Sequence, residues 1–236
     1  ILINDYVARA GLGTPFVNAG LCTLAAVLIL KRSGVVISGP AMAAVFTIAG
    51  FSLFGKNVYN IWPVMGGVWL YSRASRRPFS EYVIVALFGT ALAPLASEVS
   101  FGLGIPQPYN CLAGVAAGLA SGFLIPPLAK HLLQFHQGYN LYNIGLTAGM
   151  VGTVAMSIFR AFKVGGSGGG AWSQGNLGVY LPFVLALFGS LVAAGLAIGP
   201  RSRAGLRGIL RSTGRLVSDF PRSYGLGPSL VNMGLV

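Results

Sequence analysis

Residues 5–30 read DYVARAGLGTPFVNAGLCTLAAVLIL, and from Gly13 onward this stretch is predominantly apolar until it stops at Lys31-Arg32. A helix needs about 20 apolar residues, with roughly 17–25 tolerated, to cross the hydrocarbon core of a bilayer. Seven apolar segments follow one another along the chain. They are roughly Gly13–Leu30, Val35–Phe54, Val58–Tyr71, Tyr82–Ser97, Ile105–Ala129, Tyr139–Phe159 and Leu177–Ile198. The sequence therefore predicts an all-α, polytopic membrane helix bundle.

Two of the seven segments are irregular. Residues 58–71 are short and carry Trp62-Pro63, so this segment either spans as a broken helix or re-enters the side from which it came. The fifth segment is expected to break at Pro126-Pro127. Non-helical backbone at membrane depth persists only where protein or a watery cavity covers it.

The composition agrees with a membrane protein. Hydrophobic residues make up 54% of the chain and charged residues only 8%, whereas about 25% of a soluble domain is charged. Neither Cys22 nor Cys111 lies in a spacing that would bind a metal, so no metal and no cofactor are expected.

The net charge of +12 comes from 16 Lys and Arg residues against four acids. In a soluble protein such an excess would suggest nucleic acid, but in an apolar chain it indicates cytoplasmic loops, which are rich in Lys and Arg. We therefore expect no nucleic-acid partner. With seven crossings and residues 201–223 in the cytoplasm, twelve of the 16 cations lie in cytoplasmic loops. A re-entrant third segment gives the same division, so charge does not choose between these topologies.

Residues 5–21 recur as residues 219–235 (DFPRSYGLGPSLVNMGL), 214 positions later and without a gap. Eight of the 17 positions are identical, including Asp5 and Asp219, whose favoured role is a helix-entry cap. Internal repeats of this kind build many transporters. An odd number of crossings would turn the following repeat upside down, and we favour that arrangement because inverted repeats share a site near the midplane.

The chain is thus expected to contain a transmembrane repeat (1–200), a basic connector (201–223) and the start of a second repeat (224–236). Because it opens on Ile1 and stops within an apolar run, we expect it to be a fragment of a longer protein. Its expected partners are the lipid bilayer and the second repeat of the full-length chain, and a homo-oligomer is a further candidate assembly.

Four arginines in the basic connector repeat every four residues and share one helix face. They are Arg203, Arg207, Arg211 and Arg215. This pattern indicates an amphipathic helix in contact with the anionic lipid surface, although a plain basic connector would also show it.

Long motifs of the chain resemble one family of bacterial membrane proteins, catalogued as domain of unknown function 1576. The motifs are DYVARAGLGTPFVNAGL, FGKNVYNIWPVMGGVWLYS, LFGTALAPLASE and HQGYNLYNIGLTAGMVG. The resemblance covers nearly the whole chain and implies a multi-pass protein of a bacterial inner or plasma membrane, often with two tandem copies. It implies no activity and no site residue. A weaker similarity, on the Gly/Asn motifs of duplicated apolar halves, links the chain with urea transporters and related small-solute channels.

A second, shorter duplication places polar residues within apolar sequence: Asn57-Val58-Tyr59-Asn60-Ile61 returns as Asn140-Leu141-Tyr142-Asn143-Ile144. A buried amide without partners costs several kcal/mol. The amides therefore either cap helices and bond across them, or line a wet path. The candidate solute-path residues are Asn57, Tyr59, Asn60, Asn140, Tyr142, Asn143, Asn18 and Glu98. Tyrosines near a membrane edge are more often interface anchors. Glu98 would equally serve as a solvated helix end, and Lys56 is its nearest candidate counter-charge.

No catalytic motif is recognised: the chain lacks the H-E-x-x-H pattern, and its G-x-S-x-G match, residues 165–169, belongs to a Gly-rich loop sequence and not to a nucleophile elbow. We therefore expect no catalytic residue and no enzyme. The sequence favours a channel or secondary transporter for a small polar solute, and the alternative is a non-transporting membrane scaffold or subunit.

Overall fold

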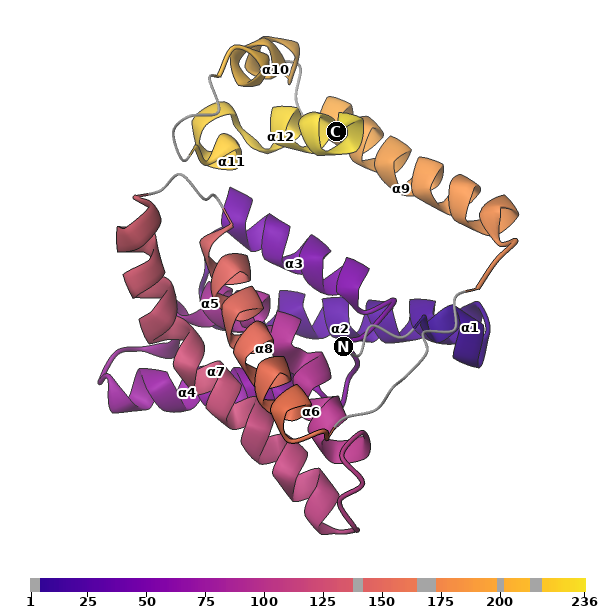
Figure 1. Cartoon of the computed structure of the whole chain (residues 1–236). Coiled ribbons are helices and arrows are strands. Elements are labelled where there is room, and N and C mark those ends of the chain that lie inside the picture. The colour runs from indigo at the N-terminus through magenta and orange to yellow at the C-terminus, as the bar shows by residue number, and fades with distance from the viewer. Residues whose placement is uncertain (1–4, 138–141, 165–172, 199–201, 213–217) are drawn as a thin grey trace. The chain divides into compact units, whose positions relative to one another are not determined.

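The apolar segments fold into helices in the computed structural model, which describes residues 5–137, 142–164, 173–198, 202–212 and 218–236 (Figure 1). Every regular element among these residues is helical, which confirms the all-α prediction. The elements are α1 (Tyr6–Ala10), α2 (Gly13–Arg32), α3 (Gly39–Phe51), α4 (Ile61–Ala74), η1 (Phe79–Glu81), α5 (Val83–Gly89), η2 (Thr90–Leu92), α6 (Ala93–Phe101), α7 (Tyr109–His136), α8 (Asn143–Ala161), α9 (Leu177–Ile198), α10 (Ser202–Leu210), α11 (Phe220–Tyr224) and α12 (Leu226–Leu235).

Five helical stretches among the described residues are long and apolar enough to cross a bilayer. They are α2, the stretch Val83–Phe101 formed by α5, η2 and α6, and then α7, α8 and α9. By contrast, α3 and α4 have 13 and 14 residues, and at about 1.5 Å per residue they reach only ~20 Å of a ~30 Å hydrocarbon core. The membrane prediction is thus supported for five of the seven segments. Whether α3 and α4 cross the bilayer stays a prediction.

The expected break at Pro126-Pro127 is wrong, because α7 runs without interruption from Tyr109 to His136. Each proline lacks the N–H that would donate to the carbonyl four residues earlier. Membrane helices tolerate this loss where neighbouring elements and small local adjustments compensate for it. Pro126 is buried inside the bundle, so packing holds the helix together at this point.

Glycines at four-residue spacing allow α7 to approach its neighbours closely. Gly114, Gly118 and Gly122 lie on one face of the helix, and a Cβ at any of them would collide with an adjacent element. Gly118 faces Pro63 of α4, and Gly122 lies against the backbone of Val64, which is also in α4. Small residues at this spacing let membrane helices pack backbone to backbone. The contact of α7 with α4 and α6 forms the core of this part of the chain.

The chain divides into two compact units, which are described separately. The first comprises residues 1–35 and 43–172, and the second comprises residues 36–42 and 173–236. In the second unit, α9 and α12 also pack through glycine: Gly195 lies against the Gly227 carbonyl, and Gly234 lies against the Phe188 carbonyl.

The two copies of the 17-residue motif begin with the same local structure. Asp5 caps α1 by accepting hydrogen bonds from Val7 and Ala8, and Asp219 caps α11. Each short helix ends at a glycine with positive φ, 74° at Gly11 and 91° at Gly225, before the next helix starts. The expected capping role of both aspartates is confirmed.

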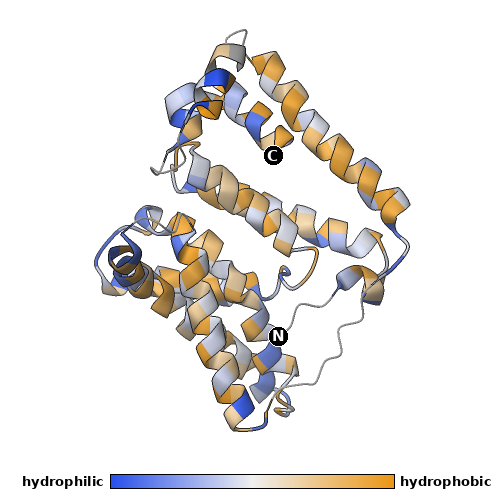
Figure 2. Cartoon of the chain, turned by 45° about the horizontal axis from the view of Figure 1, so that its top comes forward, coloured by the Kyte–Doolittle hydropathy of each residue, from blue (hydrophilic) through white to orange (hydrophobic). Residues whose placement is uncertain are grey.

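Hydrophobic residues cover much of the helix surface (Figure 2), and α9 leaves almost all of its length unburied. Its exposed residues include Leu177, Leu185 and Ile198. In water such a surface would drive aggregation, whereas in a bilayer it is the surface that lipid tails cover. The described helices therefore belong to a membrane protein.

Candidate functional site

The segment that joins α3 to α4, residues 52–60, is called the connector below. Asn18 of α2 holds it in place with all the groups of its side-chain amide. Its Nδ2 donates to the carbonyls of Ser52 (2.7 Å) and Lys56 (2.8 Å), and its Oδ1 accepts from the Val58 N–H (3.3 Å). These backbone groups lie outside regular helix and would otherwise be unsatisfied. Asn18 therefore fixes the path of the connector.

Two further amides hold the turn that precedes α4. Asn57 Oδ1 accepts from the N–H groups of Tyr59 (3.0 Å) and Asn60 (2.9 Å), and Asn60 Oδ1 accepts from the Asn57 N–H (2.8 Å). Asn60 has no exposed surface, and its Nδ2 donates to the Gly55 carbonyl (2.9 Å) and to Ser97 Oγ (3.0 Å). This reciprocal arrangement satisfies backbone N–H groups of the turn, which lie outside regular helix. Both side chains thus have a structural function at the connector.

Tyrosine hydroxyls bind at the edge of the same region. Tyr6 accepts a 3.2 Å hydrogen bond from Asn57 Nδ2. Burial raises the pKa of the Tyr6 phenol, and the bond with Asn57 only partly offsets this effect, so the hydroxyl is neutral. Tyr59 is 41% exposed, its hydroxyl lies 3.2 Å from Ser100 Oγ, and its ring packs near Phe101.

Lys56 is the unusual residue of the connector. It has no exposed surface, and its Nζ has no hydrogen-bond partner among the described residues. The contact that the ammonium makes is with the ring of Phe51, whose centroid lies 4.9 Å away. Ser52 Oγ is likewise buried and without a nitrogen or oxygen partner in this part of the chain. Ionisable side chains buried in a membrane protein are costly, and they mark functional sites by default.

Glu98 lies in α6 and is 8% exposed. Its carboxylate rests against Gly102, where any larger side chain would collide with it. The ion pairs among the described residues join Arg77 with Glu81 and Arg222 with Asp219. Lys56 forms no ion pair there, so the suggested pairing of Lys56 with Glu98 is not found.

The second amide motif is placed differently from the first. Asn140 lies outside the described residues. Asn143 begins α8 and joins it to α7, because its Nδ2 donates to the Ala129 carbonyl (2.9 Å) and its Oδ1 lies 2.9 Å from His136 Nε2. Tyr142 contacts other helices than Asn143 does. Its hydroxyl lies 3.3 Å from Thr47 Oγ1 of α3, and its ring packs edge-on against Phe88 of α5.

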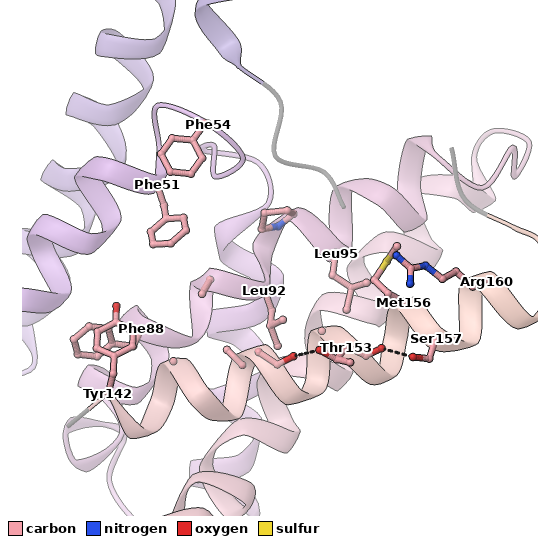
Figure 3. Close-up of a pocket in the computed structure, with 16 residues that line it drawn as sticks. Phe51, Phe54, Phe88, Leu92, Leu95, Tyr142, Thr153, Met156, Ser157 and Arg160 are labelled. Atoms are coloured by element: carbon pink, nitrogen blue, oxygen red, sulfur yellow. Dashed lines mark hydrogen bonds between the residues drawn. The ribbon is translucent and has the colours of Figure 1, made fainter. Parts of the chain in front are cut away.

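A pocket of about 590 Å³ runs along α8 in the first unit (Figure 3). Its lining is Phe51, Phe54, Phe88, Ala91, Leu92, Pro94, Leu95, Tyr142, Gly145, Ala148, Gly149, Gly152, Thr153, Met156, Ser157 and Arg160. Figure 3 shows aromatic residues towards the Tyr142 end and Arg160 at the opposite end. Thr153 and Ser157 donate to carbonyls of their own helix, which leaves their oxygens able to accept from a guest.

The structure brings together only some of the predicted solute-path residues. Asn18, Asn57 and Asn60 meet at the connector, whereas Tyr142 is the predicted residue that lines the pocket. Sequence reasoning missed the aromatic part of the pocket, and it considered Lys56 only as a partner for Glu98. An ionisable residue between two apolar segments was the signal for Lys56. No signal in the sequence marks Phe51, since one phenylalanine among many in apolar segments is unremarkable.

Three of the four arginines predicted to contact lipid lie at described positions of the second unit. Arg207 in α10 and Arg211 just after it are exposed, and Arg203 belongs to the same helix. Arg215 lies outside the described residues. The opposite face of α10 packs on protein, with Ile209 only 5% exposed and Gly208 against Tyr224.

Comparison with known proteins gives one match. No curated protein and no solved structure matches the chain. A family model described as "Protein of unknown function (DUF1576)" matches residues 1–161, which include the connector and the pocket. The chain therefore belongs to this family of proteins of unknown function.

Proposed function

We propose that the chain is part of a channel or secondary transporter for a small polar solute in a bacterial inner or plasma membrane. We further propose that it represents one half of a duplicated architecture, with the second copy inverted. The similar Asp-capped, glycine-terminated entries at α1 and α11 support the duplication. Inverted repeats build many transporter folds, so a duplication fits a transporter.

The observation that carries this proposal is the connector. It joins two helices of 13 and 14 residues inside an apolar bundle, and it contains a fully buried lysine. Transporters bind solutes at discontinuous helices, where helix ends and unwound backbone offer polar groups. A polar connector fixed by Asn18 and flanked by short helices fits this pattern.

A membrane scaffold or subunit is the second candidate, and the amides favour it. Asn18, Asn57 and Asn60 all bond to backbone groups. Amides used in this way need no solute to explain their burial. Under this alternative, Lys56 would be an unusual buried residue without a role in transport.

Flux through reconstituted vesicles separates the two candidates. The full-length protein with both copies would be inserted into liposomes and tested by stopped-flow light scattering and tracer uptake with neutral solutes (urea, glycerol) and small carboxylates. We expect at least one solute to equilibrate tenfold faster than in protein-free liposomes. If no solute does so although the inserted protein keeps its helical circular dichroism, the transporter is rejected and the scaffold stands.

A further inference from the structure

An amine without a counter-charge lies inside the first unit. Lys56 has no exposed surface, and its Nζ has no hydrogen-bond partner among the described residues. A buried ammonium has lost its hydration, and one aromatic face at 4.9 Å replaces only part of that loss. An anion would supply what the surrounding side chains lack.

The side chain cannot readily withdraw to a membrane surface, because the backbone on both sides of it is held. The Lys56 N–H donates to the Phe51 carbonyl at 3.1 Å, and the Lys56 carbonyl accepts from Asn18 at 2.8 Å. The next residue, Asn57, holds the turn that precedes α4. Lysines near helix ends usually extend their amines to water, so this arrangement keeps an amine where it would not otherwise remain.

A second donor without a nitrogen or oxygen partner lies on the same connector. Ser52 Oγ is buried and makes no hydrogen bond with a nitrogen or oxygen atom of a described residue. Its neighbour is the Cys22 thiol of α2, a weak hydrogen-bonding group that leaves the hydroxyl able to donate to a guest. One ammonium and one hydroxyl suit the two oxygens of a single carboxylate, whereas a phosphate group is usually met by several N–H donors.

Phe51 connects this amine with the pocket, because it both lies 4.9 Å from Nζ and lines the pocket. The pocket volume of about 590 Å³ lies within the usual range of roughly 300–1,000 Å³ for small-molecule sites. Its charged lining residue is Arg160, and no carboxylate lines it. Figure 3 shows the Phe51 ring near Phe54, at the end of the pocket where Phe88 and Tyr142 also lie.

We propose that the aromatic end of this pocket takes a small carboxylate with an apolar body, and that Lys56 and Ser52 receive its charged group when the Phe51 ring turns aside. Phe54, Phe88 and Leu92 would contact the apolar part. This inference rests on the proposed function, since it names the solute class of the transporter.

Binding is tested on the whole chain in lipid nanodiscs, with radiolabelled butyrate and benzoate as probes and butyramide as the uncharged match of butyrate. We expect at least one carboxylate to bind, and butyramide to compete at least tenfold more weakly than butyrate. Lys56→Met should weaken carboxylate binding tenfold or more, whereas Lys130→Met, which removes an exposed cation of the same unit, should change it less than twofold.

The proposal is overturned if neither carboxylate binds, if butyramide competes as well as butyrate, or if the two lysine variants lose binding equally. Should Lys56→Met fail to fold, the wild-type chain still decides: butyrate must raise its melting temperature and butyramide must not. Vesicle flux distinguishes this inference from the proposed function. Lys56-dependent binding without flux keeps the carboxylate site and rejects transport. Flux of neutral solutes without carboxylate binding keeps transport and rejects the carboxylate site.

Discussion

The side-chain amide of Asn18 donates a 2.8 Å hydrogen bond to the backbone carbonyl of Lys56. This contact joins residues 38 positions apart, from a long apolar helix and from a polar connector. It holds a buried lysine on a segment whose backbone has few regular hydrogen bonds of its own. The stability of the connector and the chemistry of Lys56 therefore depend on one asparagine.

Replacing Asn18 with Leu should destabilise the chain by roughly 3 kcal/mol, because each buried backbone group left unsatisfied costs about 1–3 kcal/mol. We expect the melting temperature, measured by circular dichroism in detergent, to fall by about 5–10 °C. Asn232→Leu is the matched control. Asn232 holds the equivalent position in the second copy of the 17-residue motif. Its side chain makes no hydrogen bond with the described residues, so the melting temperature should change little. Equal decreases in the melting temperatures of the two variants would contradict the role of Asn18 in holding the connector.

The glycine contact between α7 and α4 gives a second prediction. Gly122→Ala places a Cβ against the backbone of Val64, which cannot move without displacing α4. Overpacking of this kind costs about 1–3 kcal/mol. Gly20→Ala in α2 meets open space and should be neutral or slightly stabilising, since alanine favours helix by up to ~1 kcal/mol over glycine. Melting temperatures of the two variants measure the difference, and a tolerated Gly122→Ala would argue against the observed crossing.

Lys56→Met should not lower stability, although it alters a fully buried residue. Methionine fills a similar volume without the cost of burying an amine. Replacing buried charges with apolar residues of similar size is often neutral or stabilising by about 1–4 kcal/mol. The expected result is a melting temperature equal to or above that of the wild type. A clear decrease would mean that the amine has a structural partner.

Arg207 and Arg211 should recruit anionic lipid. An exposed arginine near a negatively charged membrane surface contributes about 1 kcal/mol to attraction. The double variant Arg207→Gln/Arg211→Gln should therefore retain several-fold less phosphatidylglycerol through purification than the wild type, as quantified by mass spectrometry of co-purified lipid. Arg9→Gln removes an exposed arginine that we expect on the opposite side of the membrane, and it should retain more anionic lipid than the double variant. Unchanged lipid retention in the double variant would mean that residues 201–223 are a plain basic segment without specific lipid contact.

Much of the helical framework could be predicted, because span length and helix-entry caps are local properties. The five spanning stretches follow from runs of apolar residues, and the caps at Asp5 and Asp219 follow from the residue type before a helix. The short α4 was also expected from its length. The continuity of α7 through Pro126 was not predicted, because it depends on packing that a single segment does not reveal.

The site was harder to predict than the framework. The sequence pointed to the asparagines as polar groups in apolar surroundings, but it left open whether they bond to backbone or to solute. Asn18 is separated from Ser52 by 34 positions, so their contact exists only in the folded chain. The burial of Lys56 is likewise a tertiary property, since the sequence places this residue in a polar stretch typical of an exposed loop.

Solute flux through vesicles that contain wild-type chain, Lys56→Met or Lys130→Met, normalised to inserted folded protein, tests the central claim most directly. We predict that Lys56→Met lowers the flux of the transported solute at least tenfold while its melting temperature is not reduced, and that Lys130→Met keeps the wild-type rate. Equal flux in Lys56→Met and wild type, or no flux above protein-free vesicles for any variant, would contradict transport through the connector.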